Sequence, residues 1–411
     1  MQTSCSLASQ KTWLGAHARD RYLWSALAPQ PEPEGDQQSL LAYFQSMLFA
    51  GNQDFPADRY SAFTSQSSFS QFYDAGTELG YGLAVKGQEY FGTARPDIPV
   101  RYVEPNSPAY RAGIRRGDRL RAINGRLVAD RLLASDFADL VPSAPGQTVV
   151  LTFLIPQGQE RSVTLAADVY DLVQVQGVSV LDGPSGRAGY LYLHSFTEQA
   201  LDELGAAFQT FAGQGLDTVI IDLRYNGGGL VSVSQALASW VGGDAVRGQT
   251  FVDLLHNSQN QWRNRRYFFE VALRWPGVRR AYVLTGMRSC SASEQLISGL
   301  RGAGIETITV GSTTCGKPVG ALPETHCDQV YSLVAFESVN GLGQGRYFNG
   351  IAPSCSAEDI PERDLWDPAD GLVAAALAHV RDGSCAKGRQ SPTPRRMRPS
   401  VPEPGFGVQP D

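Results

Sequence analysis

The sequence has neither a surplus of positive charge nor a long apolar run. Its 411 residues contain 35 Lys and Arg against 41 Asp and Glu, a formal net charge of -6. It therefore lacks the basic surface that neutralises nucleic-acid phosphates. No stretch approaches the roughly 20 apolar residues that cross a bilayer, and the first residues show no charged and apolar segments of a secretory signal. We expect no nucleic-acid partner, and membrane association only through an anchor outside this sequence.

The sequence also lacks the motifs that bind common metals and cofactors. It contains no paired C-x-x-C zinc spacing, no P-loop, no G-x-G-x-x-G fingerprint and no G-x-S-x-G elbow of an α/β-hydrolase. We therefore expect neither a metal nor a cofactor. The six cysteines are even in number, which permits three disulfides, and the alternative is six reduced thiols in a cytosolic protein.

A chain of this length predicts two or three domains. Residues 1–76 are expected to be a helical region, because apolar residues recur at helical spacing within 16–28 and 38–49. A stretch rich in Ser and Phe, 61–76, is predicted to be flexible. Residues 386–411 are rich in Pro and Arg with few apolar residues, which predicts a disordered tail.

Residues 77–167 are predicted to form short strands separated by turns. The order of "SPAYRAGI" and "GDRLRAING" within them resembles a PDZ domain. The resemblance implies that the loop Gly80, Tyr81, Gly82 and Leu83 binds the terminal carboxylate of a peptide, which then adds as a strand to the sheet edge. The alternative is a small β-domain used only for packing.

In residues 168–385 predicted strands alternate with predicted helices. The strands are 189–196, 217–224, 280–286 and 307–312, and the helices between them are 198–213, 230–241 and 292–304. This alternation predicts a layered α/β domain whose functional loops lie at the strand ends.

Ser291 stands where such a strand leads into a helix. Ser291 and Glu294 have the spacing of a capping box, so Ser291 is interpreted first as a helix N-cap. The positive end of a helix also favours a developing oxyanion, so the same serine is compatible with a nucleophile.

A serine nucleophile needs a base. Lys317 in "VGSTTCGKPVG" is the main candidate, because its segment is crowded with small residues and follows a strand that we expect at the same sheet edge as Ser291. It must be neutral to act, which requires desolvation or a nearby positive charge. Of the five histidines, only His194, near a strand end, is kept as a reserve base.

The ordered motifs resemble the C-terminal processing (tail-specific) proteases, peptidase family S41. They are an LR-x-N-x-GG loop from Leu223 to Gly228, the "SASE" motif from Ser291 to Glu294, and a T-x-GK motif from Thr314 to Lys317. The resemblance implies a ClpP/crotonase-like α/β protease core of layered sheet and helices, with an inserted PDZ-like β-rich domain and a helical N-terminal segment.

The resemblance also implies roles for individual residues. Ser291 matches the nucleophile and Lys317 the general base, with the N–H groups of Ala292 and of Gly227 or Gly228 as oxyanion donors. The family often has a glutamine four residues after the lysine, but Ala321 stands here, and the acidic residue found in some members on the helix after the serine is absent. Activity then rests on a Ser–Lys dyad or on an orienting group from elsewhere.

The cysteines fit the same family, whose members are commonly outside the cytoplasm. We expect Cys315–Cys327 to close a loop around Lys317, Cys355–Cys385 to bracket the last helix and Cys5 to pair with Cys290, out of fifteen connectivities. The predicted function is a serine endopeptidase acting on unfolded or tagged proteins by way of their C-termini, in the periplasm or another extracytoplasmic compartment. The alternatives are a catalytically impaired PDZ protein that binds peptides on a protease-like core, and a small-molecule esterase or amidase.

Overall fold

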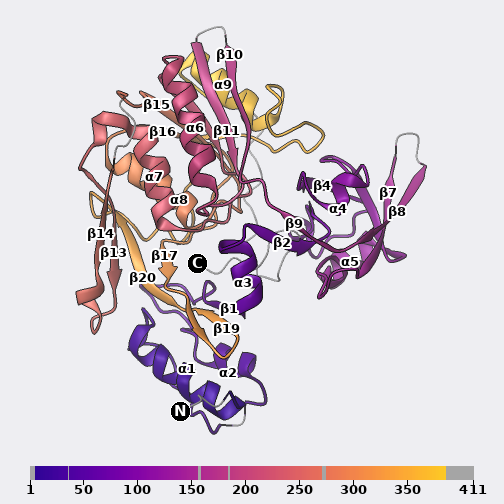
Figure 1. Cartoon of the computed structure of the whole chain (residues 1–411), viewed down its shortest axis with the longest axis vertical. Coiled ribbons are helices and arrows are strands. Elements are labelled where there is room, and N and C mark those ends of the chain that lie inside the picture. The colour runs from indigo at the N-terminus through magenta and orange to yellow at the C-terminus, as the bar shows by residue number, and fades with distance from the viewer. Residues whose placement is uncertain (1–4, 36, 156–158, 184–185, 271–274, 386–411) are drawn as a thin grey trace.

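The computed structural model describes residues 5–35, 37–155, 159–183, 186–270 and 275–385. The predicted tail, 386–411, lies outside the described residues. Figure 1 shows three parts: an upper core, a β-rich unit beside it, and an N-terminal region at the lower end. The described helices include none that is long and apolar enough for a bilayer.

The core is built on a sheet of strand order β10-β11-β12-β15-β16-β21, in which β10 runs antiparallel to β11 and the following neighbours are parallel. The strands are β10 (Val175–Gly183), β11 (Gly186–Leu193), β12 (Thr218–Asp222), β15 (Arg280–Thr285), β16 (Glu306–Gly311) and β21 (Cys355–Ser356). The helices are α6 (Ala200–Gly213), α7 (Val231–Gly242), α8 (Ala292–Gly302) and α9 (Gly371–Asp382).

Side-chain alternation gives this sheet two buried faces. Val219 and Ile221 of β12 pack with α6, α7 and α8, whereas Ile220 packs with α9 and with Tyr102 of the β-rich unit. Every residue of β12 is buried, as expected for a central parallel strand covered on both sides. The predicted strands and helices of this region agree with the observed ones to within a few residues, and the α/β class is confirmed.

A second sheet, in the order β14-β13-β20-β17, lies beside α8. Its strands are β13 (Thr250–His256), β14 (Arg265–Phe268), β17 (Val319–Ala321) and β20 (Val334–Asn340). A third sheet joins β18 (Glu324–His326) and β19 (Gln329–Ser332) to β1 (Ala62–Ser65). The N-terminal region therefore contributes a strand to a hairpin that follows Lys317.

The N-terminal region differs from the prediction in two places. Helix α1 (Leu7–Arg21) ends before the predicted limit of residue 28, because Tyr22 turns to an extended conformation and its N–H caps Ala18 O. The stretch predicted to be flexible forms β1 and α3 (Gln66–Tyr73), with Ser65 as the helix cap. Helix α2 (Leu40–Ser46) lies within the predicted range.

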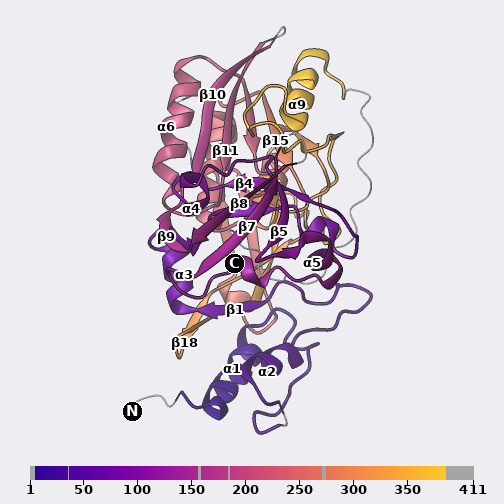
Figure 2. The same ribbon diagram turned by 90° about the vertical axis from the view of Figure 1, so that its right-hand side faces the viewer.

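The β-rich unit contains a sheet in the order β3-β4-β5-β7-β8. Its elements are β3 (Leu83–Val85), β4 (Ile98–Val103), α4 (Pro108–Arg111), β5 (Arg119–Ile123), β6 (Arg126–Leu127), α5 (Val128–Ala134), β7 (Thr148–Leu154) and β8 (Glu160–Ala166). Strand β7 alternates buried and exposed residues, because one face covers the unit's own core. Strands β2 (Thr77–Gly80) and β9 (Asp168–Asp171) pair where the chain enters and leaves the unit. Turned by 90°, the structure shows this sheet lying across the core (Figure 2).

Candidate active site

Ser291 lies at the N-terminus of α8, in the loop that follows β15. Its side chain is 5% exposed. Its backbone has φ 53° and ψ -115°, a conformation that residues with a Cβ rarely adopt. Such a backbone persists only when its surroundings hold it, and it occurs most often at functional sites.

Lys317 lies in the loop between β16 and β17. Because β15 and β16 are adjacent parallel strands, paired up to Thr285 and Gly311, the loops after them meet at one edge of the sheet. Lys317 is 8% exposed, and burial lowers the pKa of its amine to about 8, against the opposing charges of Asp58 and Glu294. A fraction of the amine is therefore neutral near pH 7, as a general base requires.

Glu294 joins the two loops. Its carboxylate Oε2 accepts hydrogen bonds from the N–H of Ser291 at 3.1 Å and from the N–H of Lys317 at 2.7 Å, and Oε1 accepts from the N–H of Gly316 at 2.9 Å. The hydroxyl of Thr314 donates to the same carboxylate. Burial raises the pKa of Glu294 to about 7, although these donors oppose the shift. One carboxylate thus sets the backbones of Ser291 and Lys317 side by side.

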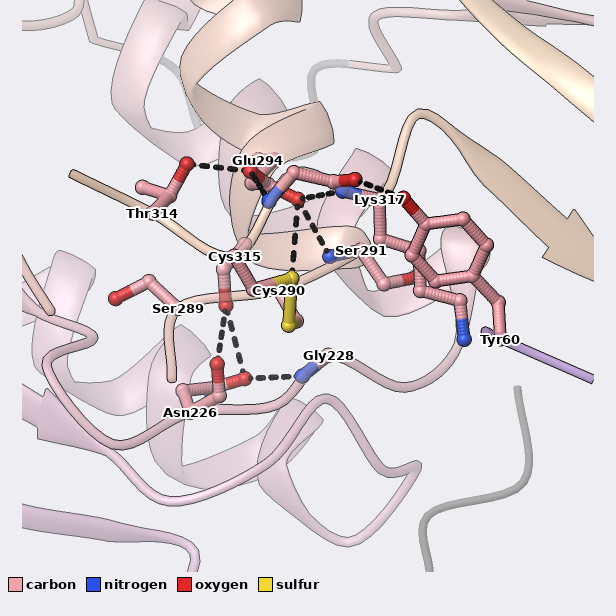
Figure 3. The surroundings of a disulfide bond; sticks show 12 residues. Tyr60, Asn226, Gly228, Ser289, Cys290, Ser291, Glu294, Thr314, Cys315 and Lys317 are labelled. Atoms are coloured by element: carbon pink, nitrogen blue, oxygen red, sulfur yellow. Dashed lines mark hydrogen bonds between the residues drawn. A yellow bond between two sulfur atoms is a disulfide. The ribbon is translucent and has the colours of Figure 1, made fainter. Parts of the chain in front are cut away.

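Tyr60 completes the surroundings of the lysine. Nζ of Lys317 lies 5.7 Å from the centre of the Tyr60 ring, and the Tyr60 hydroxyl donates to Gly316 O at 2.5 Å. In Figure 3 the Ser291 hydroxyl and the Lys317 side chain both extend toward this ring. Ala321, where the family often has glutamine, lies in β17 and offers no polar side chain. Sequence reasoning missed Tyr60, because nothing in the sequence links it to a loop more than 250 residues away.

The glycine-rich loop after β12 lies against the serine. A Cβ built on Gly228 would be 2.8 Å from Cβ of Ser291 and 3.2 Å from the N of Ala292. The N–H of Gly228 donates to Oδ1 of Asn226 at 2.8 Å, so in this structure it is not available to an oxyanion. The N–H groups of Ala292 and Gly227 remain the candidate donors.

Comparison with known proteins agrees with this arrangement. Residues 187–347 match the sequence profile of Peptidase family S41, and residues 100–155 match that of the PDZ domain. The core is a peptidase family S41 domain. The match begins in β11 and ends after β20, so it includes Gly227, Ser291, Glu294 and Lys317.

Curated relatives match more than two thirds of this chain, over part of their own length. The carboxy-terminal processing protease CtpB of Bacillus subtilis is 27% identical over 300 residues, which cover 69% of this chain and 55% of the relative. The carboxyl-terminal-processing protease of Synechocystis sp. is 29% identical over 294 residues, 70% of this chain and 66% of the relative. The chain thus spans about half to two thirds of the length of these relatives.

Solved structures show the same fold. A putative S41 protease from Bacteroides fragilis superposes with a TM-score of 0.70 at 21% identity, covering 90% of this chain and 97% of that one. The photosystem II D1 C-terminal processing protease superposes with a TM-score of 0.53 at 18% identity and the same coverages. The expected S41 core with a PDZ domain is confirmed.

The disulfides differ from the prediction in two of three pairs. Cys355–Cys385 is confirmed, but Cys5 pairs with Cys327 and Cys290 with Cys315. Cys327 lies at the turn between β18 and β19, where the hairpin points away from Lys317 and toward α1. Cys290 and Cys315 lie on the two adjacent loops that carry Ser291 and Lys317.

His194, the reserve base, is enclosed between the S41 and PDZ domains. It is 1% exposed, and burial lowers its pKa to about 4. Its Nδ1 lies 3.9 Å from Oε2 of Glu104, whose pKa burial raises to about 8, so both groups are uncharged at neutral pH. His194 is therefore part of the buried interface between the two domains.

The predicted carboxylate-binding loop of the PDZ domain is buried. Gly80, Tyr81, Gly82 and Leu83 are all buried, and a Cβ on Gly82 would lie 1.9 Å from Cβ of Ser107. Strand β3, which follows the loop, is an edge strand of its sheet, as strand addition requires.

The PDZ domain also contacts the loops of the candidate active site. Arg116 donates to the hydroxyl of Tyr225 at 2.6 Å, next to Asn226 of the glycine-rich loop. Glu89 pairs with Arg288 of the serine loop at 3.3 Å. The PDZ domain therefore makes polar contacts next to the glycine-rich loop and with the loop that carries Ser291.

Within the part of the chain that the structure describes, one group of side chains has the spacing of metal ligands. The ligand atoms of Cys355, His379 and Cys385 lie within 4.8 Å of one another. The two sulfurs form a disulfide, which leaves no thiolate to bind a metal, and the hydroxyl of Tyr282 hydrogen-bonds Nδ1 of His379 at 3.0 Å.

Proposed function

We propose that this protein is a serine endopeptidase that cleaves polypeptides by a Ser291–Lys317 mechanism. The observation that carries the proposal is the Glu294 carboxylate, which holds the nucleophile's loop and the lysine's loop together while the lysine amine is buried. The names of the curated relatives, carboxy-terminal processing proteases, support the same reaction.

The proposed reaction is acyl transfer. The proton of the Ser291 hydroxyl passes to neutral Nζ of Lys317 as Oγ attacks the peptide carbonyl. The N–H groups of Ala292 and Gly227 stabilise the tetrahedral oxyanion, and each aligned donor contributes about 3 kcal/mol. Lys317 then returns the proton to the leaving amine, and water releases the acyl group from Ser291.

Labelling with a fluorophosphonate tests the nucleophile. We expect wild type to be labelled at Ser291 and to cleave an unfolded protein, and Ser291→Ala to do neither. Ser298→Ala, on the same helix α8, is the matched control and keeps both. Wild type that folds but shows neither labelling nor cleavage would instead support a PDZ protein that binds peptides without turnover.

We further propose that the PDZ domain recognises substrate C-termini at Gly80 to Leu83. A peptide with a free C-terminal carboxylate is expected to have a lower KM than the same peptide amidated at its C-terminus, with kcat little changed. Equal KM values for the two peptides would contradict this part of the proposal.

We also propose that the protein acts outside the cytoplasm. Three disulfides and no free cysteine occur among the described residues, and disulfides persist in oxidising compartments. Fractionation of the native host and non-reducing peptide mapping of the protein from each fraction would test it. Protein found mainly in the cytoplasm with reduced cysteines would refute it.

A further inference from the structure

The Cys290–Cys315 disulfide joins the two loops that carry the proposed nucleophile and base. Cys290 directly precedes Ser291, and Cys315 lies two residues before Lys317. Their Cα atoms are 5.3 Å apart, although the cysteines are 25 residues apart in the sequence. Figure 3 shows the S–S bond beneath the Glu294 carboxylate.

This covalent link acts on the same segments as Glu294. Sγ of Cys315 lies 3.6 Å from Oε2 of Glu294, the oxygen that accepts the N–H groups of Ser291 and Lys317. The N–H of Cys315 also donates to Ser289 O at 3.1 Å, on the serine loop. The hydrogen-bonded link depends on an ionisable carboxylate, whereas the disulfide link does not.

The backbone of Ser291 has an unfavourable conformation that the neighbouring disulfide can stabilise. A positive φ of 53° at a serine is unfavourable and needs support from neighbouring residues. Cys290, the residue immediately before it, is fixed covalently to a second strand-end loop. Cleaving the disulfide removes this covalent support next to Ser291 and leaves only hydrogen bonds, among them the one from the N–H of Cys290 to Asn226 O at 3.2 Å.

We propose that the Cys290–Cys315 disulfide positions Ser291 and Lys317 for catalysis and that its reduction by a dithiol lowers turnover. The inference rests on the proposed peptidase function. Both cysteines are partly exposed. The disulfide is thus a redox control site, and Cys290 and Cys315 are positioning residues.

The chemistry is ordinary thiol–disulfide exchange. A thiolate of the dithiol attacks one sulfur, the S–S bond breaks and a mixed disulfide forms. The second thiolate of the reagent then displaces the protein sulfur. Cys290 and Cys315 gain two electrons and two protons and end as thiols, while the dithiol becomes a cyclic disulfide.

Paired variants test the proposal. Cys290→Ala/Cys315→Ala removes this disulfide, and Cys355→Ala/Cys385→Ala is the matched control that removes another. We expect the first variant to lose about tenfold or more in kcat/KM, because small misplacements of reacting groups cost up to about 10²-fold. The control is expected to keep wild-type activity. Dithiothreitol should lower the activity of wild type and of the control, but not that of Cys290→Ala/Cys315→Ala.

Two further readouts separate positioning from general stability. Far-UV circular dichroism at the assay temperature is expected to match wild type for both variants, while fluorophosphonate labelling of Ser291 slows only in Cys290→Ala/Cys315→Ala. If that variant does not fold, brief reduction of folded wild type gives the same comparison. Full activity without the Cys290–Cys315 link, or an equal loss in the control, overturns the proposal. Wild type that is inactive when oxidised refutes the peptidase function itself.

Discussion

Replacing Lys317 with Met is expected to stabilise the protein while abolishing peptidase activity. Burial lowers the pKa of this amine from its ordinary value of 10.5 to about 8. The unfolded chain therefore binds a proton at Lys317 more tightly than the native state does. A pKa unit corresponds to about 1.4 kcal/mol, so the buried lysine destabilises the native state by about 3 kcal/mol at pH 7.

The sign follows from proton binding. Between pH 8 and 10.5 the unfolded state holds more protons at Lys317 than the native state, so wild-type stability rises with pH in this range. Methionine does not titrate, and all other groups are common to both proteins. The stability advantage of Lys317→Met should therefore shrink by about 2 kcal/mol between pH 7 and pH 9.5.

Urea unfolding of both proteins at several pH values measures this difference. Lys317→Arg is the matched contrast, because a guanidinium cannot lose its proton and should be less stable than wild type throughout. A difference between wild type and Lys317→Met that stays constant from pH 7 to 9.5 would refute the argument. It would show that the native amine has an ordinary pKa.

Three other predictions concern the surroundings of the site. The kcat/KM for an unfolded substrate should rise about tenfold from pH 7 to 9, as the neutral fraction of Lys317 grows, and a flat profile would contradict a lysine base. Tyr60→Leu should raise the apparent pKa of that profile, because removing the ring exposes the Lys317 amine to water. Tyr60→Phe keeps the ring and should leave the apparent pKa near 8. The same shift in both variants would argue against a role of the ring in burying the amine. Arg224→Met should lower the free energy of unfolding by about 3–5 kcal/mol in urea titration, because Asp222 and Asp370 lose a buried counter-charge; a loss below about 1 kcal/mol would be inconsistent with the ion pairs in the structure.

The parts of the fold that sequence reasoning predicted are those with local signals. Strands β11, β12, β15 and β16 are short apolar runs bounded by turn residues, and α6, α7 and α8 follow them with helical spacing. In the PDZ domain, strand β7 shows the alternation of buried and more exposed residues that is typical of a strand with one face on the core. The positions of Ser291 and Lys317 at one sheet edge then followed from parallel strand order.

The rest depends on contacts between distant segments. Residues 61–76 were predicted to be flexible because their Ser-rich sequence has no clear period, yet β1 is ordered by pairing with β19. The predicted pairings of two disulfides were wrong, because the sequence does not show in which direction the β18–β19 hairpin, which carries Cys327, extends. Tyr60 was missed for the same reason, since its partner Gly316 is set by the tertiary fold alone.

The separation between contacting segments has a consequence for synthesis of the chain. Arg59 donates hydrogen bonds to Cys315 O at 3.2 Å and to Phe348 O at 3.1 Å, and Cys5 is bonded to Cys327, 322 residues away. Cys5 and Arg59 are therefore synthesised long before the segments that they contact, and they cannot dock until those segments have followed. The loops of the candidate active site therefore reach their final arrangement only after most of the residues that surround them have been synthesised.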